Sequence, residues 1–304
     1  MSLLVLSETD VRRVLTMEAC IEAMDEVLRL LARGELLQPL RPVFRAPEGG
    51  TLLGLMPAYR GGAAPAWSLK EIVIAPGNPA RGLDSHQGGV LLHDGETGEL
   101  RALVNASPVT EVRTAAVSAV ATRALARPDA HVVAILGGGV QARAHEEAMR
   151  AVLPEAEIRT WTRGDGGTPE GMLRGADVVC TCTSAREPIL ERAWLAAGAH
   201  VNAVGSSVPS ARELDEATVA EATLVVDRRE SALNEAGDLL VPGFGAERIA
   251  AELGEVLVGD HPGRTRGEEL TVFKSLGLGV EDLAAAELVV RLAREQGVGT
   301  EVDF

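Results

Sequence analysis

Lysine is almost absent from this sequence, so its two lysines are the first candidates for chemistry. Of the 29 basic residues only Lys70 and Lys274 are lysines, and all the others are arginines. Either residue type can serve as a surface cation, but only an ammonium group can lose its proton near neutral pH. A lysine retained against such a bias is a candidate for proton transfer. The alternative is chance, and Lys274 is interpreted as a structural cation.

A glycine-rich segment directly follows a short apolar run, His131–Leu136. The pattern Gly137-x-Gly139-x-x-Ala142 then opens a helical stretch, which is the context of a dinucleotide-binding turn. Gly137 permits the tight turn, Gly139 lets the backbone approach the pyrophosphate, and Ala142 keeps the helix close to the strand. The helix N-terminus offers N–H groups to the phosphates. The alternative is a glycine turn that binds nothing.

The end of the next apolar run bears on the choice between NAD and NADP. NAD sites usually place an acid at the end of the second strand, where it holds the ribose 2′-hydroxyl. Here the run ends in Thr162 and Arg163, and Asp165 follows two residues later. A hydroxyl and a guanidinium suit a 2′-phosphate better, so NADP is favoured over NAD. The glycine-rich segment 164–175 predicts a shortened second helix.

The elements that position these residues fall into two groups. Up to Ala126 the pattern predicts helices capped by Ser7 and Thr16, strands separated by Gly and Pro turns, and a helix over Thr114–Ala126, which together make an α+β unit. After Pro128, short apolar runs alternate with connecting segments, which is typical of a parallel sheet covered on both faces. These runs are His131–Leu136, Glu157–Trp161, Asp177–Thr181, Ala199–Val204, Thr223–Asp227 and Leu270–Phe273.

The predicted fold class is therefore α/β, with a Rossmann-type dinucleotide-binding domain and an α+β domain. We expect the α+β domain to span residues 1–126 and the Rossmann domain residues 127–279. A closing helix begins at Val280, and residues 280–304 are expected to pack back on the first domain.

Composition argues against several other functions. The formal charge of −15 repels phosphate backbones and anionic membranes, so nucleic acid and membranes are unexpected partners. No apolar run reaches the roughly 20 residues needed to span a bilayer. The first ten residues lack the pattern of a signal peptide, and three cysteines and six histidines show no disulfide or metal-ligand spacing. We expect a cytoplasmic protein without a metal.

Several motifs, in the right order along nearly the whole chain, resemble those of the ornithine cyclodeaminase/mu-crystallin family. They are Leu53-Gly54-Leu55-Met56-Pro57-Ala58-Tyr59, Lys70, Thr110-Glu111-Val112-Arg113-Thr114-Ala115-Ala116, Gly137–Ala142, Gly263-Arg264, Thr271-Val272-Phe273-Lys274-Ser275-Leu276-Gly277-Leu278 and Glu281-Asp282. The resemblance implies a homodimer whose first domain supplies both the subunit contact and the substrate site.

The resemblance also implies roles for individual residues. Arg41 and Arg113 match the two arginines that bind the substrate carboxylate, for which paired guanidinium donors are suited. Lys70 matches the catalytic lysine, and Asp227, at a strand end, matches the acid beside the reacting nitrogen. The residues expected to contact the cofactor are Thr114, Gly137, Gly139, Val140, Gln141, Ala142, Thr162, Arg163, Ser275 and Gly277.

These roles imply an NAD(P)-dependent oxidoreductase that transfers hydride to or from a small imino or amino acid. A cyclic imine or ketimine would be reduced, or an L-amino acid oxidised, while Asp227 or Lys70 handles the proton. Ornithine cyclodeaminases carry an acid where this sequence has Gly54, so efficient conversion of ornithine to proline and ammonia is not expected. That activity stays the alternative, together with a mu-crystallin-like protein that binds NADP and a small ligand without turnover.

Overall fold

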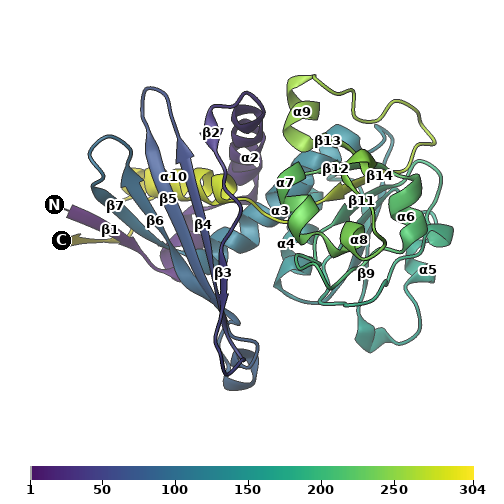
Figure 1. The fold of residues 1–304 in the computed structure, drawn as a ribbon, viewed down its shortest axis with the longest axis horizontal. Helices are drawn as coiled ribbons and strands as arrows, with labels where there is room; N and C mark the ends of the chain where they lie inside the picture. Colours follow the sequence, from purple (N-terminus) through teal and green to yellow (C-terminus); the bar gives the residue numbers. More distant parts are fainter. Residues whose placement is uncertain (1) are drawn as a thin grey trace. The chain divides into compact units, whose positions relative to one another are not determined.

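The computed structural model describes residues 2–304, which form two compact units. Unit 1 comprises residues 2–113 and 278–304, and unit 2 comprises residues 114–277. Each unit contains one β-sheet with helices packed on it (Figure 1). The predicted bounds of 1–126 and 127–279 for a substrate domain and a cofactor domain stay a prediction.

Unit 1 is built on an eight-stranded sheet in the order β15-β1-β7-β6-β5-β4-β2, with β3 also paired to β4. All pairings are antiparallel except that of β1 with β7, so the sheet is mixed. The strands are β1 (Ser2–Leu6), β2 (Leu36–Leu37), β3 (Val43–Arg45), β4 (Leu52–Arg60), β5 (Ala66–Ile74), β6 (His86–Asp94), β7 (Leu100–Asn105) and β15 (Thr300–Asp303), and the short 3-10 helix η1 (Asn78–Arg81) precedes β6.

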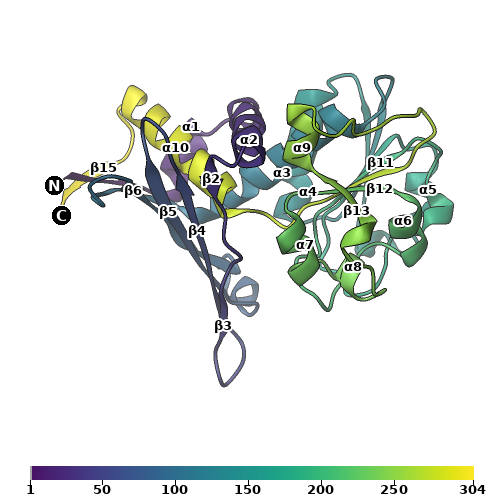
Figure 2. The same ribbon diagram turned by 45° about the horizontal axis from the view of Figure 1, so that its top comes forward.

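Three helices of unit 1, α1 (Glu8–Val14), α2 (Met17–Ala32) and α10 (Gly279–Gln296), gather on one face of this sheet (Figure 2). The predicted caps are present, since the hydroxyl of Ser7 accepts the N–H of Asp10 and that of Thr16 accepts the N–H of Ala19. The alternation along β5 follows from the single covered face: Ser68, Lys70 and Ile72 are buried, while Trp67 and Val73 on the opposite face are exposed.

Unit 2 is built on a seven-stranded parallel sheet in the order β13-β12-β14-β11-β10-β8-β9. The chain runs from β8 to β9 on one side and then crosses to β10 on the other side of β8. Ligands of such sheets bind at the carboxyl ends of the two strands where the order reverses, here β8 and β10. The strands are β8 (Val132–Leu136), β9 (Glu157–Trp161), β10 (Val178–Thr181), β11 (His200–Ala203), β12 (Thr223–Val226), β13 (Ile249–Glu252) and β14 (Thr271–Lys274).

Helices cover both faces of this sheet, as the apolar runs predicted. On one face Asn202 of β11 donates a hydrogen bond to Thr122 of α3. On the other face the neighbouring Val201 and Ala203 belong to a hydrophobic cluster with side chains of α6 and α8. The helices are α3 (Ala106–Leu125), α4 (Val140–Val152), η2 (Arg163–Asp165), α5 (Glu170–Leu173), η3 (Arg192–Trp194), α6 (Glu216–Glu221), α7 (Arg229–Glu235), α8 (Gly237–Leu240), η4 (Ala246–Arg248) and α9 (Leu253–Val258).

The predicted fold class, a Rossmann-type domain with an α+β domain, is confirmed. The main local difference is that α3 starts at Ala106, eight residues before the predicted start at Thr114. Asn105 explains the early start, because its side-chain carbonyl accepts the N–H of Ser107 at the beginning of the helix. Pro108 is tolerated there because N–H groups in a first turn have no intrahelical partner. The early start puts Thr110 and Arg113 on the helix.

Candidate active site

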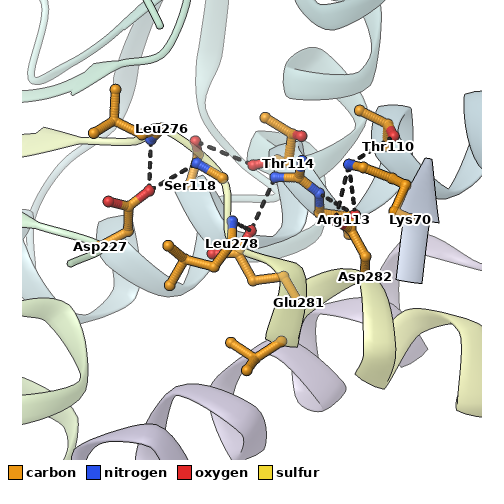
Figure 3. Close-up of polar contacts among 12 residues, drawn as sticks. Lys70, Thr110, Arg113, Thr114, Ser118, Asp227, Leu276, Leu278, Glu281 and Asp282 are labelled. Carbon is orange, nitrogen blue, oxygen red and sulfur yellow. Dashed lines mark hydrogen bonds and ion pairs between the residues drawn. The ribbon is translucent and has the colours of Figure 1, made fainter. Parts of the chain in front are cut away.

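Lys70 lies on the covered face of β5 and is 2% exposed. Its Nζ contacts both carboxylate oxygens of Asp282, at 2.9 Å from Oδ1 and 2.8 Å from Oδ2, and lies 3.4 Å from the hydroxyl of Thr110 (Figure 3). Asp282 belongs to the first turn of α10 and Thr110 to the first part of α3. A buried ammonium needs such partners, because burial without a counter-charge strongly disfavours the charged form.

The surroundings lower the pKa of Lys70 from 10.5 to about 8. Burial is the largest cause, and the positive charges of Arg113 and Arg41 act in the same direction. The carboxylate of Asp282 opposes them and holds the pKa higher than burial alone would leave it. The amine therefore exchanges its proton much closer to neutral pH than an ordinary lysine does.

Arg113 comes from α3 and is also buried, at 4% exposure. Its Nε donates to Oδ1 of Asp282 at 3.1 Å, and its Nη1 donates to Oε2 of Glu281 at 2.9 Å. The same Glu281 oxygen accepts the backbone N–H of Leu278 at 3.1 Å (Figure 3). Lys70 and Arg113, predicted from the sequence as site residues, therefore lie together against two adjacent acids.

The start of α10 is fixed by contacts within unit 1. Oε1 of the buried Gln38 accepts the N–H of Val280 at 2.9 Å. A Cβ atom on Gly279 would lie 2.8 Å from the carbonyl oxygen of Pro57, so the helix approaches β4 as closely as only glycine allows. Two carboxylates in a first helical turn are favoured by the helix dipole. The positions of Glu281 and Asp282 are therefore fixed by the backbone contacts at the start of α10 as well as by their ion pairs with Lys70 and Arg113.

Arg41 lies in the half-buried segment between β2 and β3. Its charge contributes to lowering the pKa of Lys70, which puts the guanidinium within electrostatic range of the ammonium. With Lys70 protonated, three cations (Lys70, Arg41 and Arg113) act around two anions (Glu281 and Asp282). The cluster then carries a net charge of about +1, which suits one carboxylate of a ligand.

Glu281, Asp282 and Thr110 belong to motifs recognised in the sequence, but no role was predicted for any of them. A usable signal was present, because two adjacent acids stand in the first turn of a helix and are followed directly by four apolar residues, 283–286. Acids in that place are common as helix-terminal residues, and only the sheet and α3 bring cations to them.

The glycine turn of unit 2 has the geometry that its pattern predicts. Gly137 has φ of 140°, and a Cβ atom there would lie 2.5 Å from the carbonyl oxygen of Cys182. A Cβ atom on Gly138 would lie 2.9 Å from the methyl carbon of Thr162, whereas one on Gly139 would meet nothing within 4 Å. Gly139 is the N-cap of α4 and gives it no side-chain hydrogen bond. The N–H groups of this first turn are thus presented beside an open backbone, which fits a pyrophosphate.

The remaining predicted residues of this turn belong to α4. Val140 and Gln141 begin the helix, and Val140 is exposed. Ala142 is buried, in agreement with close packing of the helix on the sheet.

Thr162 and Arg163 follow β9, at the carboxyl edge of the sheet. The N–H and the hydroxyl of Thr162 both donate to Oδ2 of Asp165, and Arg163 is exposed at the start of η2. A cavity of about 460 Å³ lies here, lined by Thr160, Trp161, Thr162, Asp165, Gly166, Thr168, Gly171 and Met172. The following helix, α5, has only four residues, as the glycine-rich segment predicted.

Asp227 follows β12, is 1% exposed, and accepts three backbone N–H groups. Its Oδ2 receives that of Leu276 at 2.5 Å (Figure 3). The same oxygen receives that of Gly277 at 2.8 Å, and Oδ1 receives that of Arg228 at 2.8 Å. Gly277 has φ of 81°, a left-handed turn that glycine adopts without strain. Asp227 therefore holds the turn that contains the predicted residues Ser275 and Gly277.

Two further predicted features have ordinary structural surroundings. Thr114 is buried, and its carbonyl oxygen lies 3.5 Å from the hydroxyl of Ser118. Lys274 is buried, with its Nζ 2.9 Å from Asp238. Asp238 also accepts the N–H groups of Glu213 and Leu214, so Lys274 completes a core ion pair.

Residues 2–304 contain no group of three or more His, Cys, Asp or Glu side chains placed to hold a metal ion. No helix among these residues is long and apolar enough to cross a membrane.

Comparison with known proteins agrees with the sequence motifs. Residues 1–170 and 166–297 match the model of the ornithine cyclodeaminase/mu-crystallin family. Ketimine reductase mu-crystallin of Mus musculus is 43% identical over 272 residues, which cover 84% of this chain and 85% of that protein.

Two solved structures are similar over essentially the whole chain. An archaeal alanine dehydrogenase dimer with bound NAD is 30% identical with a TM-score of 0.93, and the match covers 100% of both chains. The Δ1-pyrroline-2-carboxylate reductase of Thermococcus litoralis, in complex with NADH and L-proline, is 33% identical with a TM-score of 0.90. That match covers 98% of this chain and 100% of the other.

Proposed function

The chain belongs to the ornithine cyclodeaminase/mu-crystallin family, and we propose that it is an NAD(P)-dependent reductase of small imino carboxylates. Cyclic imines and ketimines are the proposed substrate class, and oxidation of an L-amino acid is the reverse reaction. The observation that carries the proposal is the buried ammonium of Lys70, held beside Arg113 in a cluster of net positive charge. The relatives named as reductases and as a dehydrogenase support this class of reaction.

The proposed substrate is an anion with one carboxylate. Arg41 and Arg113 supply guanidinium groups, whose paired donors suit the two oxygens of a carboxylate. The net charge of about +1 in the cluster favours a monocarboxylate over a neutral amine or a dicarboxylate. L-proline, found with the Thermococcus enzyme, has one carboxylate and is the product expected from a five-membered cyclic imine.

The residues of unit 2 suit a dinucleotide. Gly137, Gly139 and the first turn of α4 would receive the pyrophosphate, because they combine an open backbone with uncapped N–H groups. We propose NADP rather than NAD as the preferred form. The carboxylate of Asp165 already accepts two hydrogen bonds from Thr162, and Arg163 adds an exposed cation suited to a 2′-phosphate.

We assign separate roles in the reaction to Lys70 and Asp227. Bound NAD(P)H supplies the hydride that reduces the C=N carbon. Lys70 donates the proton that balances this step at nitrogen, and the reverse reaction returns it. Asp227 holds the turn of residues 275–277 through its backbone hydrogen bonds, and its predicted part in proton transfer is tested separately by substitution.

Two further properties belong to the proposal. The chain is proposed to form a homodimer through the uncovered face of the unit 1 sheet, where apolar side chains such as Trp67 and Val73 are exposed. A cytoplasmic location is supported by three buried cysteines that remain thiols.

The experiment that tests the function follows the loss of NADPH and NADH absorbance with a panel of cyclic imines, and of 2-oxo acids with an amine. Ornithine with NAD⁺ is assayed in parallel. Lys70→Met and Asp227→Ala variants are compared with the wild type, and cofactor binding is measured for each. Turnover of an imine that Lys70→Met abolishes, with cofactor affinity retained, supports the proposal. Cofactor binding without turnover of any member of the panel contradicts it and favours a binding protein.

A further inference from the structure

Asp282 contacts two of the predicted site cations, Lys70 and Arg113. Its Oδ1 accepts hydrogen bonds from Nζ of Lys70 at 2.9 Å and from Nε of Arg113 at 3.1 Å. Its Oδ2 lies 2.8 Å from the same Nζ. The side chain is 0% exposed, so water does not screen either interaction.

The two cations reach Asp282 from different elements that are distant in sequence. Lys70 comes from β5, 212 residues before Asp282, and Arg113 comes from α3, 169 residues before it. The helix that carries Asp282 is anchored independently, by Gln38 on the N–H of Val280 and by the contact of Gly279 with β4. The carboxylate is therefore a fixed point against which both cations are placed.

Glu281 provides a natural comparison because it is adjacent and equally buried. Its Oε2 accepts hydrogen bonds from Arg113 and from the N–H of Leu278. Its named contacts thus fix the guanidinium and the start of the helix, whereas those of Asp282 reach the ammonium (Figure 3).

We propose that Asp282 is the positioning residue of this site: its carboxylate sets both the place and the protonation of Lys70 and couples them to Arg113. The proposal rests on the proposed function, in which Lys70 donates the proton and Arg113 binds the substrate carboxylate. It assigns to Asp282 no contact with substrate or cofactor.

The charged groups around Lys70 show why the carboxylate of Asp282 should have the largest effect in keeping the ammonium protonated. Thr110 and Arg113 face the ammonium from α3, Asp282 from α10, and Arg41 from the segment before β3. The pKa of His86 of β6 is lowered chiefly by burial, and the charge of Lys70 lowers it further, so His86 is within electrostatic range of the ammonium. Asp282 is the acid among these groups, and Glu281, the other acid of the cluster, makes its named contacts with Arg113 and Leu278. Removal of the Asp282 carboxylate should therefore lower the pKa of Lys70 by about one unit or more, as expected for the loss of an opposite charge at this distance.

The scarcity of lysine allows a direct test. Because the chain has only Lys70 and Lys274, lysine labelled with ¹³C at Cε gives two resonances, and a Lys274→Met variant assigns them. The chemical shift of each is followed from pH 6 to pH 11 in the full chain, without substrate. Lys274, which pairs with Asp238 in unit 2, serves as the internal control.

We expect Asp282→Asn to move the Lys70 midpoint to lower pH and to leave the Lys274 resonance unchanged. Glu281→Gln, the matched control, should move the Lys70 midpoint much less. The proposal is wrong if Asp282→Asn leaves the Lys70 midpoint where it is in the wild type, or if both variants shift it equally.

Catalysis supplies the second readout. The alkaline limb of kcat for imine reduction should move with the Lys70 midpoint in Asp282→Asn. Asp282→Glu keeps the charge but lengthens the side chain, so it should retain the midpoint to within about half a unit while kcat falls at least about tenfold. Wild-type kcat in Asp282→Glu overturns the positioning role even if Asp282→Asn fails to fold. A wild-type chain that reduces no imine, yet shows the shifted midpoint, overturns the proposed function and leaves the coupling of Asp282 to Lys70 supported.

Discussion

At the scale of single residues, we expect the ammonium of Lys70 to set how the proposed reaction depends on pH. The pKa of Lys70 is lowered to about 8, chiefly by burial, so the proposed proton donor is present below that pH and lost above it. We expect kcat/KM for imine reduction to fall about tenfold per pH unit above pH 8, and amine oxidation to rise through the same range. Initial rates in both directions between pH 6 and 10 measure this. A residual rate in Lys70→Met with the same alkaline limb would assign the titration to another group.

We expect Gly54 to separate the proposed reaction from ornithine cyclodeamination, whose enzymes are expected to carry an acid at this position. Gly54 occupies a buried position of β4 and is paired with Ile72 of β5. A Cβ atom there would lie 3.5 Å from a methyl carbon of Ile72, which is ordinary van der Waals contact, so an acidic side chain begins without a clash. We expect wild type to form no appreciable proline from ornithine with catalytic NAD⁺, and Gly54→Glu to gain measurable ammonia release. Release of ammonia by the wild type at the rate of imine reduction would contradict this expectation.

At the scale of elements, the turn between β8 and α4 contains two glycines with different expected roles. Gly137 should affect both stability and cofactor binding, whereas Gly139 should affect cofactor binding alone. Gly137→Ala forces a Cβ atom to within 2.5 Å of a backbone oxygen at positive φ, so it should lower both Tm and cofactor affinity. Gly139→Ala meets nothing within 4 Å, so Tm should stay unchanged while a methyl group obstructs the pyrophosphate. Thermal unfolding and fluorescence titration with NADPH measure the two effects. Equal NADPH affinity in Gly139→Ala and wild type would place the phosphates elsewhere.

The same elements show what the sequence predicts well and what it does not. The run His131–Leu136 and its glycine turn are local patterns, and both the strand and the start of the helix were predicted correctly. Strands β1 and β15 were not predicted, because they depend on pairing between distant parts of the chain: β15, at the sheet edge, pairs with β1, and β1 pairs with β7. Local sequence carries little signal for such long-range pairings.

The candidate site was also predicted only in part, because some of its contacts join distant parts of the chain. Lysine scarcity and family motifs predicted Lys70 and Arg113 as site residues, but no local pattern indicated that Asp282 would lie between them. That contact depends on α10 returning to the sheet of unit 1, over 150 residues later. Likewise, Asp227 was predicted as a strand-end acid, and its hydrogen bonds to Leu276 and Gly277 require β12 and β14 to be neighbours.

At the scale of the whole molecule, two buried histidines should make the protein sensitive to acid. Burial lowers the pKa of His145 to about 4 and that of His200 to about 3, both below the ordinary value of 6.5. The unfolded chain then binds more protons, so stability is fully present above about pH 6.5 and is lost as the pH falls towards 4. Urea unfolding at pH 7, 6 and 5 measures this loss. Unfolding of His200→Gln should take up about one proton fewer than unfolding of the wild type as the pH falls from 7 to 5, so its free energy of unfolding should depend less steeply on pH. A slope equal to that of the wild type would contradict this expectation.

We expect the chain to dimerise through the uncovered face of the unit 1 sheet. Side chains of adjacent strands form an apolar surface there: Leu69 is opposite Pro57 and Leu91, and the rings of Tyr59 and Trp67 have centroids 4.6 Å apart.

Trp67 and Val73 on this face are 42% and 39% exposed in the single chain, which is costly for large apolar groups unless a partner covers them. We expect wild type to be a dimer at micromolar concentration by light scattering and Trp67→Arg to be a monomer. Val241→Arg is the matched control, because Val241 of unit 2 is 49% exposed and lies outside this sheet, so its variant should stay dimeric. A dimeric Trp67→Arg together with a monomeric Val241→Arg would move the interface to unit 2.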